Sequence, residues 1–572
     1  MNSELLGVIV TFLLTVLLAY PLGRYIAKVF SGQRTILDFM KPLESLIFRI
    51  SGVNTKEGMD WKQFLKAMLT INMLWFVYAF FMFLFQGHLP LNPDCNPNMT
   101  PDLSFNTAIS FITNTNWQNY SGETGVTYLT QLVVITFLQF VSAATGIACL
   151  VGMLNGLKEK TTNNLGNFWQ IFTVSITRIL LPISIVIAII LAFNGTPASF
   201  DGKDTFIGLQ GDTINVSRGP AAGMIAIKHL GTNGGGWYNA NSAHPLENPN
   251  YFTNMLEIIA QVLIPISLLF AMGLYIKRKK FAYVIFGIMT LGMLCLAIPT
   301  IITEIHGNPE IARLGIAQST GAMEGKEVRF GPAASGYWSI VTTIISTGSV
   351  NSMHDSSMAL SGLMQLLGML VNGFYGGCGV GILNYFIYII IAVFMSGLMV
   401  GRTPEFMGHK VEAREVKIAA IITLLSAILI KGGLAIACYT LLHYPNANWD
   451  VKPSAWLNNS SYHGFSEMMY AVTSANANNG SAFAGLTGNN IFWNVLLGVT
   501  ILLGRYLPII GPIAIIGLLA KKKYVPDTAG TLKVDSITFG VMTFGVILII
   551  TALSYFPPLV LGPIADYLSM HH

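Results

Sequence analysis

Long apolar segments alternate with shorter polar ones along most of the chain, and ten of the apolar segments are long enough to cross a bilayer. A transmembrane helix needs about 20 predominantly apolar residues to cross roughly 30 Å of hydrocarbon. The predicted spans cover residues 5–29, 67–86, 126–154, 170–193, 254–276, 281–301, 358–400, 418–441, 491–520 and 537–562. This pattern predicts an all-α integral membrane protein with ten transmembrane helices.

The seventh predicted span, 358–400, is too long for a single helix and carries a cluster of glycines in its middle. These are Gly373, Gly376, Gly377, Gly379 and Gly381. Glycine weakens a helix, and irregular backbone at membrane depth is tolerated only where it is buried in protein or lines a cavity. We therefore expect two half-helices joined by irregular backbone. The residues alone leave open whether this segment is a gate or a packing kink.

Composition supports the membrane assignment, because only 10% of the 572 residues are charged and 53% are apolar. A soluble protein carries about 25% charged residues to cover its surface. The net charge of +5 gives no indication of a nucleic-acid partner, since the placement of basic residues matters more here than their sum. The five cysteines show no metal-binding CxxC spacing.

Lys and Arg residues are concentrated in every second loop. The basic loops are 30–62, 155–169, 277–280, 401–417 and 521–536. Loops on the cytoplasmic side of a membrane are enriched in basic residues. The alternation therefore predicts that these loops are cytoplasmic and that both termini lie on the outer side.

The four main outer loops share one pattern, in which a stretch able to form a short helix precedes a polar segment rich in Asn, Thr, Ser and Gly. The polar segments are 113–116, 231–234, 345–348 and 473–476, and the helical stretches are 101–113, 219–231, 333–345 and 462–473. Aligning Asn116, Gly234, Gly348 and Asn476 gives spacings of 118, 114 and 128 residues. Near-constant spacing is typical of an internal repeat. The sequence thus predicts four membrane–pore loop–membrane repeats around a pseudo-fourfold pore.

The residue types in these loops favour a site for a dehydrated monovalent cation. Backbone carbonyls from four loops around an axis can replace the water shell of potassium. Gly and Asn accept the positive φ that such a backbone requires, and Thr and Ser add hydroxyl oxygens. The aligned segments contain no carboxylate, which argues against a divalent cation. The negative end of each short helix would point at the ion.

Six strings in the chain resemble the potassium-binding subunit of the bacterial Kdp-type potassium-transporting ATPases. They are TNTNWQ at 113–118, LGTNGGG at 230–236, NANSAHP at 239–245, VNSMHDS at 350–356, GRTPEF at 401–406 and NNGSAFAGL at 478–486. The resemblance runs from the first span to the last. It implies a fold of four pore-forming units with one extra span at each end.

The resemblance also implies which residues bind potassium. They are Asn114, Thr115, Asn116, Gln118, Thr232, Asn233, Gly234, Ser346, Thr347, Gly348, Ser474, Ala475 and Asn476. The glycine-broken seventh span would be a gate below this filter, from which potassium passes sideways toward the energy-coupling subunit. The implied division is an N-terminal span and loop at 1–62, pore repeats at 63–160, 161–280, 281–410 and 411–530, and a C-terminal span at 531–572.

Charged residues within or near the apolar segments have two interpretations. They are Arg178, Glu257, Lys431, Glu467 and Arg505. Such charges are costly in lipid and usually face protein or water. Arg505, in the ninth span, would place a fixed positive charge below the filter and oppose cation leak, and Arg402 is a second candidate for this role. The alternative is a structural ion pair or a snorkelling side chain.

Four histidines flank three of the polar loops: His229, His244, His354 and His463. Because no metal-ligand spacing joins them, we expect them to support the loops through hydrogen bonds.

The chain shows no energy source of its own. It contains neither a GxxxxGK[ST] phosphate loop nor the Asp-Lys-Thr-Gly motif of P-type pumps. The resemblance implies that ATP and Mg²⁺ bind a P-type catalytic subunit, accompanied by two small membrane subunits in the bacterial inner membrane. This chain would then supply the potassium site. The alternatives are a stand-alone potassium channel or a Trk/Ktr/HKT-type cation symporter, and a membrane oxidoreductase, which would require paired histidines on facing spans.

Overall fold

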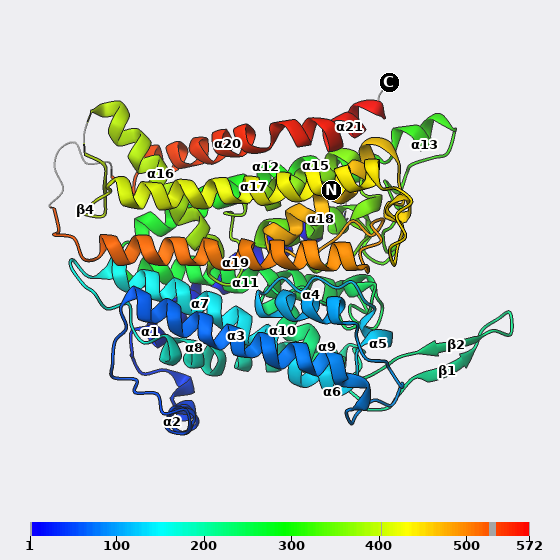
Figure 1. The fold of residues 1–572 in the computed structure, drawn as a ribbon, viewed down its shortest axis with the longest axis horizontal. Helices are drawn as coiled ribbons and strands as arrows, with labels where there is room; N and C mark the ends of the chain where they lie inside the picture. Colours follow the sequence, from blue (N-terminus) through cyan, green and yellow to red (C-terminus); the bar gives the residue numbers. More distant parts are fainter. Residues whose placement is uncertain (1–2, 402, 526–532, 571–572) are drawn as a thin grey trace.

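The computed structural model describes residues 3–401, 403–525 and 533–570. Its long helices lie side by side in one bundle (Figure 1). Within the described residues, ten helices are long and apolar enough to cross a membrane. They are Ser3–Phe30, Trp61–His88, Tyr128–Lys158, Phe168–Phe193, Tyr251–Tyr275, Lys279–Arg313, Val380–Met399, Ala413–His443, Ile491–Leu519 and Ile537–Ser569. The predicted multi-pass, all-α membrane architecture is confirmed.

The helices have the following bounds. The long ones are α1 (Ser3–Phe30), α3 (Trp61–Phe85), α7 (Phe137–Lys158), α9 (Leu181–Phe193), α11 (Tyr251–Tyr275), α12 (Lys279–His306), α16 (Val380–Val400), α17 (Ala413–His443), α19 (Ile491–Leu519) and α20 (Ile537–Leu559). The shorter ones are α2 (Lys41–Ile50), α4 (Pro101–Ile112), α5 (Gly122–Gly125), α6 (Tyr128–Thr130), α8 (Phe168–Ser175), α10 (Ala221–Leu230), α13 (Pro309–Arg313), α14 (Gly331–Ile345), α15 (Ala359–Val371), α18 (Ser461–Asn476) and α21 (Ala565–Ser569). π-helical turns at Gln131–Thr136, Ile176–Leu180 and Val560–Ile564 join α6 to α7, α8 to α9 and α20 to α21.

Side-chain caps fix where several spans begin. The Asp60 carboxylate accepts hydrogen bonds from the first backbone N–H groups of α3, and the Gln63 side chain accepts one from the Asp60 N–H. Asn250 and Thr253 form the same reciprocal cap at the start of α11. Such caps satisfy backbone donors that have no partner inside the helix.

The spans form an inner and an outer set. In their most apolar windows, α7, α11 and α19 are 72% to 78% buried, whereas α1, α3, α17 and the α20 span are 17% to 33% buried. Apolar side chains left exposed over a long helix are compatible with a lipid environment and not with water. The outer set therefore faces lipid or a partner.

Four short helices, α4, α10, α14 and α18, lie between successive pairs of spans. They occupy the places where the sequence predicts pore helices. With 10 to 16 residues each, they are too short to cross the bilayer at a rise of about 1.5 Å per residue. The chain therefore turns back at the end of each one, inside the bundle.

The seventh predicted span is two helices, as the glycine cluster indicates. α15 ends at Val371 and α16 begins at Val380, so residues 372–379 are irregular. Asn372, Tyr375, Gly377 and Gly379 all have positive φ. This backbone leaves the helical region at the depth where the pore helices end.

Two small antiparallel hairpins complete the fold. β1 (Asp204–Ile207) pairs with β2 (Thr213–Val216), so that Asp204 is opposite Val216. This hairpin projects from the end of the bundle that also carries α13 (Figure 1). β3 (Glu405–Phe406) and β4 (His409–Lys410) form the second hairpin at the opposite end.

Candidate ion-binding site

The four pore helices end in the same backbone conformation. The residues Asn114, Thr232, Ser346 and Asn478 have φ values of 63°, 51°, 58° and 54°. Two residues later, Asn116, Gly234, Gly348 and Gly480 again have positive φ, at 54°, 92°, 86° and 95°. Since non-glycine residues rarely adopt positive φ, four matched pairs indicate one turn used four times.

A shared hydrogen bond fixes the alignment of the four turns. The backbone N–H between each positive-φ pair donates to the carbonyl five residues earlier. These bonds run from Thr115 to Ser110 (3.0 Å), Asn233 to Lys228 (2.8 Å), Thr347 to Thr342 (3.0 Å) and Asn479 to Ser474 (2.9 Å). The equivalent segments are therefore 114–116, 232–234, 346–348 and 478–480.

The alignment of the fourth segment from sequence is wrong by four residues. Ser474, Ala475 and Asn476 form the last turn of α18 and keep helical conformation. The chain leaves the helix only after Ala477, so Asn478, Asn479 and Gly480 occupy the turn. Ser474 instead supports the turn from below, because its hydroxyl accepts a hydrogen bond from the Gly480 N–H at 3.1 Å.

The four segments touch one another in a closed ring. A β-carbon built on Gly234 would lie 1.9 Å from the Thr347 carbonyl oxygen. A β-carbon built on Gly348 would lie 2.0 Å from the Asn479 carbonyl oxygen, and one built on Gly480 would lie 1.9 Å from the Thr115 carbonyl oxygen. Each glycine thus admits a backbone oxygen of the next segment, which a side chain would exclude.

Asparagine side chains complete the ring on either side of the first segment. The Asn114 Nδ2 donates to the Thr232 carbonyl at 2.7 Å, and the Asn116 Nδ2 donates to Asn233 Oδ1 at 3.1 Å. The Asn478 Nδ2 donates to Thr115 Oγ1 at 3.0 Å, which joins the fourth segment to the first. Asn116 therefore takes the place of the glycine found in the other three segments.

The oxygens of this ring are neutral and some lack a partner. Among the described residues, Thr347 Oγ1 and Asn116 Oδ1 are buried without a hydrogen bond. Leaving a buried polar atom unsatisfied costs about 1–3 kcal/mol. Buried, uncharged oxygens without a protein donor are suited to a weakly hydrated cation.

Gln118 links the first and second loops beside the ring. Its Oε1 accepts from the Gly236 N–H at 2.9 Å, and its Nε2 donates to the Gly236 carbonyl at 3.0 Å. Both ends of the amide are therefore engaged by protein backbone in this structure.

The irregular segment 372–379 lies directly against the ring. The Cys378 N–H donates to Thr232 Oγ1 at 3.1 Å, and the Ser346 hydroxyl donates to Asn372 Oδ1 at 3.0 Å. A β-carbon built on Gly381 would lie 2.4 Å from the backbone of Gly376, so the segment packs tightly against the start of α16. The irregular segment thus contacts the second and third segments of the ring.

Arg505 is buried in α19. The residue before it, Gly504, packs against the end of α18, since a β-carbon built there would lie 2.4 Å from the Asn476 carbonyl oxygen. No ion pair involves Arg505 within the described residues. Arg402, the second predicted gating arginine, lies outside the described residues. A polar cavity of about 50 Å³ lined by Asn372, Asn384 and Asn476 adjoins this region.

At membrane depth, Arg178 is part of a structural ion pair. It bonds Glu44 of the amphipathic α2 at 2.5 Å and Asp38, just before α2, at 2.9 Å, which ties the turn between α8 and α9 to this segment. The His229 ring lies 2.9 Å from the Glu257 carboxylate. Lys431, by contrast, is exposed on α17.

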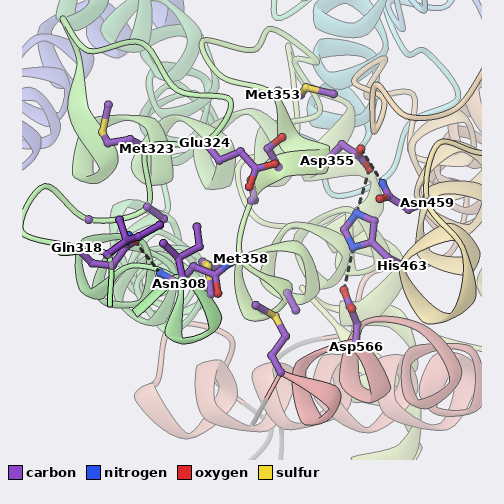
Figure 2. A pocket seen from close by; sticks show the side chains of 18 of the residues that line it. Asn308, Gln318, Met323, Glu324, Met353, Asp355, Met358, Asn459, His463 and Asp566 are labelled. Carbon is purple, nitrogen blue, oxygen red and sulfur yellow. Dashed lines mark hydrogen bonds and ion pairs between the residues drawn. The ribbon is translucent and has the colours of Figure 1, made fainter. Parts of the chain in front are cut away.

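The histidines support the loops, as predicted. His354 Nδ1 pairs with the Tyr470 hydroxyl at 2.9 Å, and His244 stacks on Tyr238 with ring centroids 4.0 Å apart. His463 lies at the edge of a cavity of about 710 Å³ (Figure 2).

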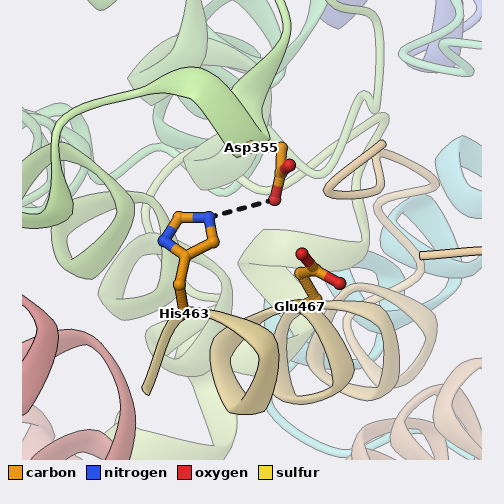
Figure 3. A group of neighbouring side chains, drawn as sticks. All are labelled: Asp355, His463 and Glu467. Carbon is orange, nitrogen blue, oxygen red and sulfur yellow. Dashed lines mark hydrogen bonds and ion pairs between the residues drawn. The ribbon is translucent and has the colours of Figure 1, made fainter. Parts of the chain in front are cut away.

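His463 bridges two carboxylates across this cavity. Its Nε2–H donates to Asp355 at 3.1 Å and its Nδ1–H to Asp566 at 2.9 Å. Glu467 lies beside Asp355 (Figure 3) and accepts hydrogen bonds from the Asn459 backbone and side-chain nitrogens. Burial lowers the pKa of His463, but the hydrogen bonds and charges of Asp355 and Asp566 outweigh it and raise the pKa to about 10.

We expect His463→Gln to lower stability by about 1–3 kcal/mol, because it removes two charge-assisted hydrogen bonds. The folded-state pKa is raised above the ordinary value of 6.5, so this contribution is complete below pH 6.5 and is lost as pH rises through about 10. Thermal midpoints of the two proteins in detergent should therefore converge between pH 7 and pH 10. His306→Gln, at an exposed histidine at the end of α12, is the matched control and should leave the midpoint unchanged.

Comparisons with known proteins agree along the whole chain. The model of the family described as KdpA, potassium-transporting ATPase A subunit, matches residues 9–568. A protein of Flavobacterium psychrophilum named potassium-transporting ATPase potassium-binding subunit is 61% identical over 573 residues, covering 100% of both chains. A protein of the same name from Alicyclobacillus acidocaldarius is 47% identical, covering 99% of both chains.

A solved structure is similar in fold. The crystal structure of the potassium transporter TrkH from Vibrio parahaemolyticus superposes with a TM-score of 0.50 and 14% sequence identity. The match covers 89% of this chain and 97% of that chain. At this identity the likeness concerns the fold alone.

Proposed function

The chain belongs to the family of potassium-transporting ATPase A subunits, and from that premise we propose that its ring of four loops binds potassium selectively at the outer face. In this proposal the ring admits the ion to the translocation path of an ATP-driven uptake complex. The binding residues are those of segments 114–116, 232–234, 346–348 and 478–480.

The observation that carries the proposal is the closed ring itself. Backbone carbonyls of Thr115, Thr347 and Asn479 lie at the contacts between neighbouring segments. Each of the pore helices α4, α10, α14 and α18 ends at the ring, so its partial negative charge faces a bound cation. A ring of several neutral oxygens favours potassium over a divalent ion, because carboxylates would hold a divalent ion better.

Below the ring, we propose that segment 372–379 and Arg505 block the straight route to the cytoplasm. The segment contacts two of the four loops, and the buried arginine adds a positive charge that repels cations. The polar cavity beside Asn372 and Asn476 offers a start for a sideways route toward the energy-coupling partner.

The rest of the assembly follows the family resemblance. We propose that ATP and Mg²⁺ bind a P-type catalytic subunit and that two small membrane subunits complete the complex in the bacterial inner membrane. The basic loops would be cytoplasmic and both termini would lie outside. The chain would divide into four pore repeats flanked by one extra span at each end.

Reconstitution in liposomes tests the proposal. Complexes of the chain with its partner subunits should be oriented with the potassium ring outside the liposome and supplied with Mg²⁺-ATP inside. They should then accumulate ⁸⁶Rb⁺ or potassium, and potassium should stimulate their ATP hydrolysis. The chain alone should conduct neither ion at a comparable rate. Passive potassium flux through the isolated chain would instead establish a channel, and sodium-driven uptake would establish a symporter.

A further inference from the structure

A buried ion pair lies behind the second segment of the ring. Lys228, in the last turn of α10, places its Nζ 2.5 Å from Glu247 Oε2, and both side chains are fully buried. The Lys228 backbone carbonyl also accepts the N–H groups of Asn233 and Gly234. One residue therefore supports this segment through both its backbone and its side chain.

Asn241 connects this ion pair to a ring carbonyl. Its Oδ1 accepts a hydrogen bond from Lys228 Nζ at 2.7 Å, and its Nδ2 donates to the Gly234 carbonyl at 2.7 Å. The same Oδ1 lies 3.2 Å from the Ser349 hydroxyl and 3.3 Å from the Val350 N–H, just beyond the third segment. Asn241 thus fixes the second segment relative to the third.

Glu247 is itself held in place. Its Oε1 accepts the Tyr238 N–H at 2.8 Å, while Lys228 Nζ also donates to the Ser242 hydroxyl at 2.9 Å. Loop 238–247 is therefore fastened at both ends to the pore helix it follows. A satisfied, buried polar network of this kind defines one geometry, because any displacement leaves charges unpaired.

The other three segments lack such a pair at the equivalent position. The backbone hydrogen bond that each turn makes to the carbonyl five residues earlier aligns Lys228 with three short hydroxyl residues, Ser110, Thr342 and Ser474. The Ser110 hydroxyl accepts the Trp117 N–H, and the Ser474 hydroxyl accepts the Gly480 N–H. Only the second segment, in the described part of the chain, combines this position with a buried charge.

We propose that the Lys228–Glu247 pair is a positioning element of the potassium site: it fixes Asn241, whose amide holds the Gly234 carbonyl in the orientation that selective binding requires. The inference rests on the proposed function of the ring. Lys228 and Glu247 do not contact the ion in this proposal, and they act through Asn241.

The direction in which potassium affinity changes when Lys228 is replaced separates positioning from simple electrostatics. Removing the ammonium alone leaves the Glu247 carboxylate uncompensated near the ring, which by charge alone would attract potassium more strongly. Positioning predicts the opposite, since Asn241 loses its anchor. The double variant Lys228→Met/Glu247→Gln keeps the site neutral and close to its original shape, and it still removes the bond to Asn241.

The experiment measures potassium-stimulated ATP hydrolysis of the assembled complex as a function of potassium and of rubidium. Both Lys228→Met and the neutral double variant should raise the half-saturating potassium concentration about tenfold, with the maximal rate within about twofold of the original. The preference for potassium over rubidium should fall in the same variants. Unchanged or tighter potassium dependence in the double variant would overturn the proposal.

A second buried pair in the same chain provides the matched control. Lys326 and Glu304 lie 2.9 Å apart, their side chains are 2% and 1% exposed, and Glu304 likewise accepts a backbone N–H, that of Met358. Within the described residues, no hydrogen bond joins either residue to the ring segments. Lys326→Met/Glu304→Gln should lower the thermal midpoint without shifting the potassium dependence. Equal shifts in both double variants would show general destabilisation and refute positioning.

If Lys228→Met alone fails to assemble, the neutral double variant decides the inference, because it leaves no charge of the pair buried without a partner. Gly234→Ala distinguishes this inference from the proposed function. If Gly234→Ala weakens potassium dependence and the Lys228 variants do not, positioning is wrong and the ring site stands; if neither does, the ring is not the potassium site.

Discussion

Gly234→Ala is expected to raise the potassium concentration for half-maximal ATP hydrolysis by about a hundredfold, equivalent to about 2.7 kcal/mol. Gly234 has a φ of 92°, which an alanine adopts only with strain, and its β-carbon would lie 1.9 Å from the Thr347 carbonyl oxygen. Backbone atoms cannot move aside as a flexible side chain does. The methyl group must therefore displace the third segment from the ring.

Gly223→Ala is the control for this substitution. Gly223 lies in the same pore helix, α10, and a β-carbon there would meet no atom within 4 Å. Alanine at that position should leave potassium dependence unchanged and stabilise the helix by about 0.5–1 kcal/mol. Titration of ATPase activity against potassium checks both variants. Indistinguishable curves for Gly234→Ala and the parent protein would contradict the ring site.

Deleting Gly376 and Gly377 from the irregular segment is expected to uncouple potassium movement from ATP hydrolysis. The shortened segment cannot keep both the Cys378 contact to Thr232 and the Asn372 contact to Ser346. Losing them opens the straight route below the ring. ATP-independent ⁸⁶Rb⁺ flux in proteoliposomes should rise by about a hundredfold, a change in barrier of about 2.7 kcal/mol.

A deletion of the same size at the tip of the β1–β2 hairpin serves as control. Leu209 and Gln210 are exposed there, far from the bundle core (Figure 1). Their removal should leave flux dependent on ATP. A Gly376–Gly377 deletion that still pumps with the original ratio of ions to ATP would exclude a gating role for the segment.

Hydropathy and glycine placement were sufficient to predict the spans and the break. The ten spans could be predicted because apolar length is imposed by the thickness of the bilayer, whatever the tertiary contacts. The break between α15 and α16 could be predicted because five glycines interrupt an otherwise continuous apolar segment. Both signals are local in the sequence.

The register of the fourth segment could not be obtained from local composition. Thr473–Asn476 resembles the first segment in residue types, yet Ser474, Ala475 and Asn476 continue the helix. The informative residue was Gly480, which aligns with Gly234 and Gly348 through its positive φ. Small and polar residues at a helix end do not indicate where the helix stops, whereas a glycine that a neighbouring carbonyl must approach does.

Long-range polar contacts were also beyond the sequence. Arg178 pairs with Glu44 across 134 residues, and Lys228 meets Asn241 through a turn that depends on the positive φ of Asn241. In the sequence, Lys228 is a single basic residue near the end of the predicted helical stretch 219–231. The full burial of the Lys228 side chain depends on the loop that covers it, which the local sequence does not show.

The most direct test of the account is the location of a heavy potassium analogue in the assembled complex. Crystals or frozen grids prepared with Tl⁺ in place of potassium should show density on the axis enclosed by segments 114–116, 232–234, 346–348 and 478–480, and the density should be lost in Gly234→Ala. Thallium bound elsewhere in the chain, with the ring axis empty at saturating concentration, would contradict it.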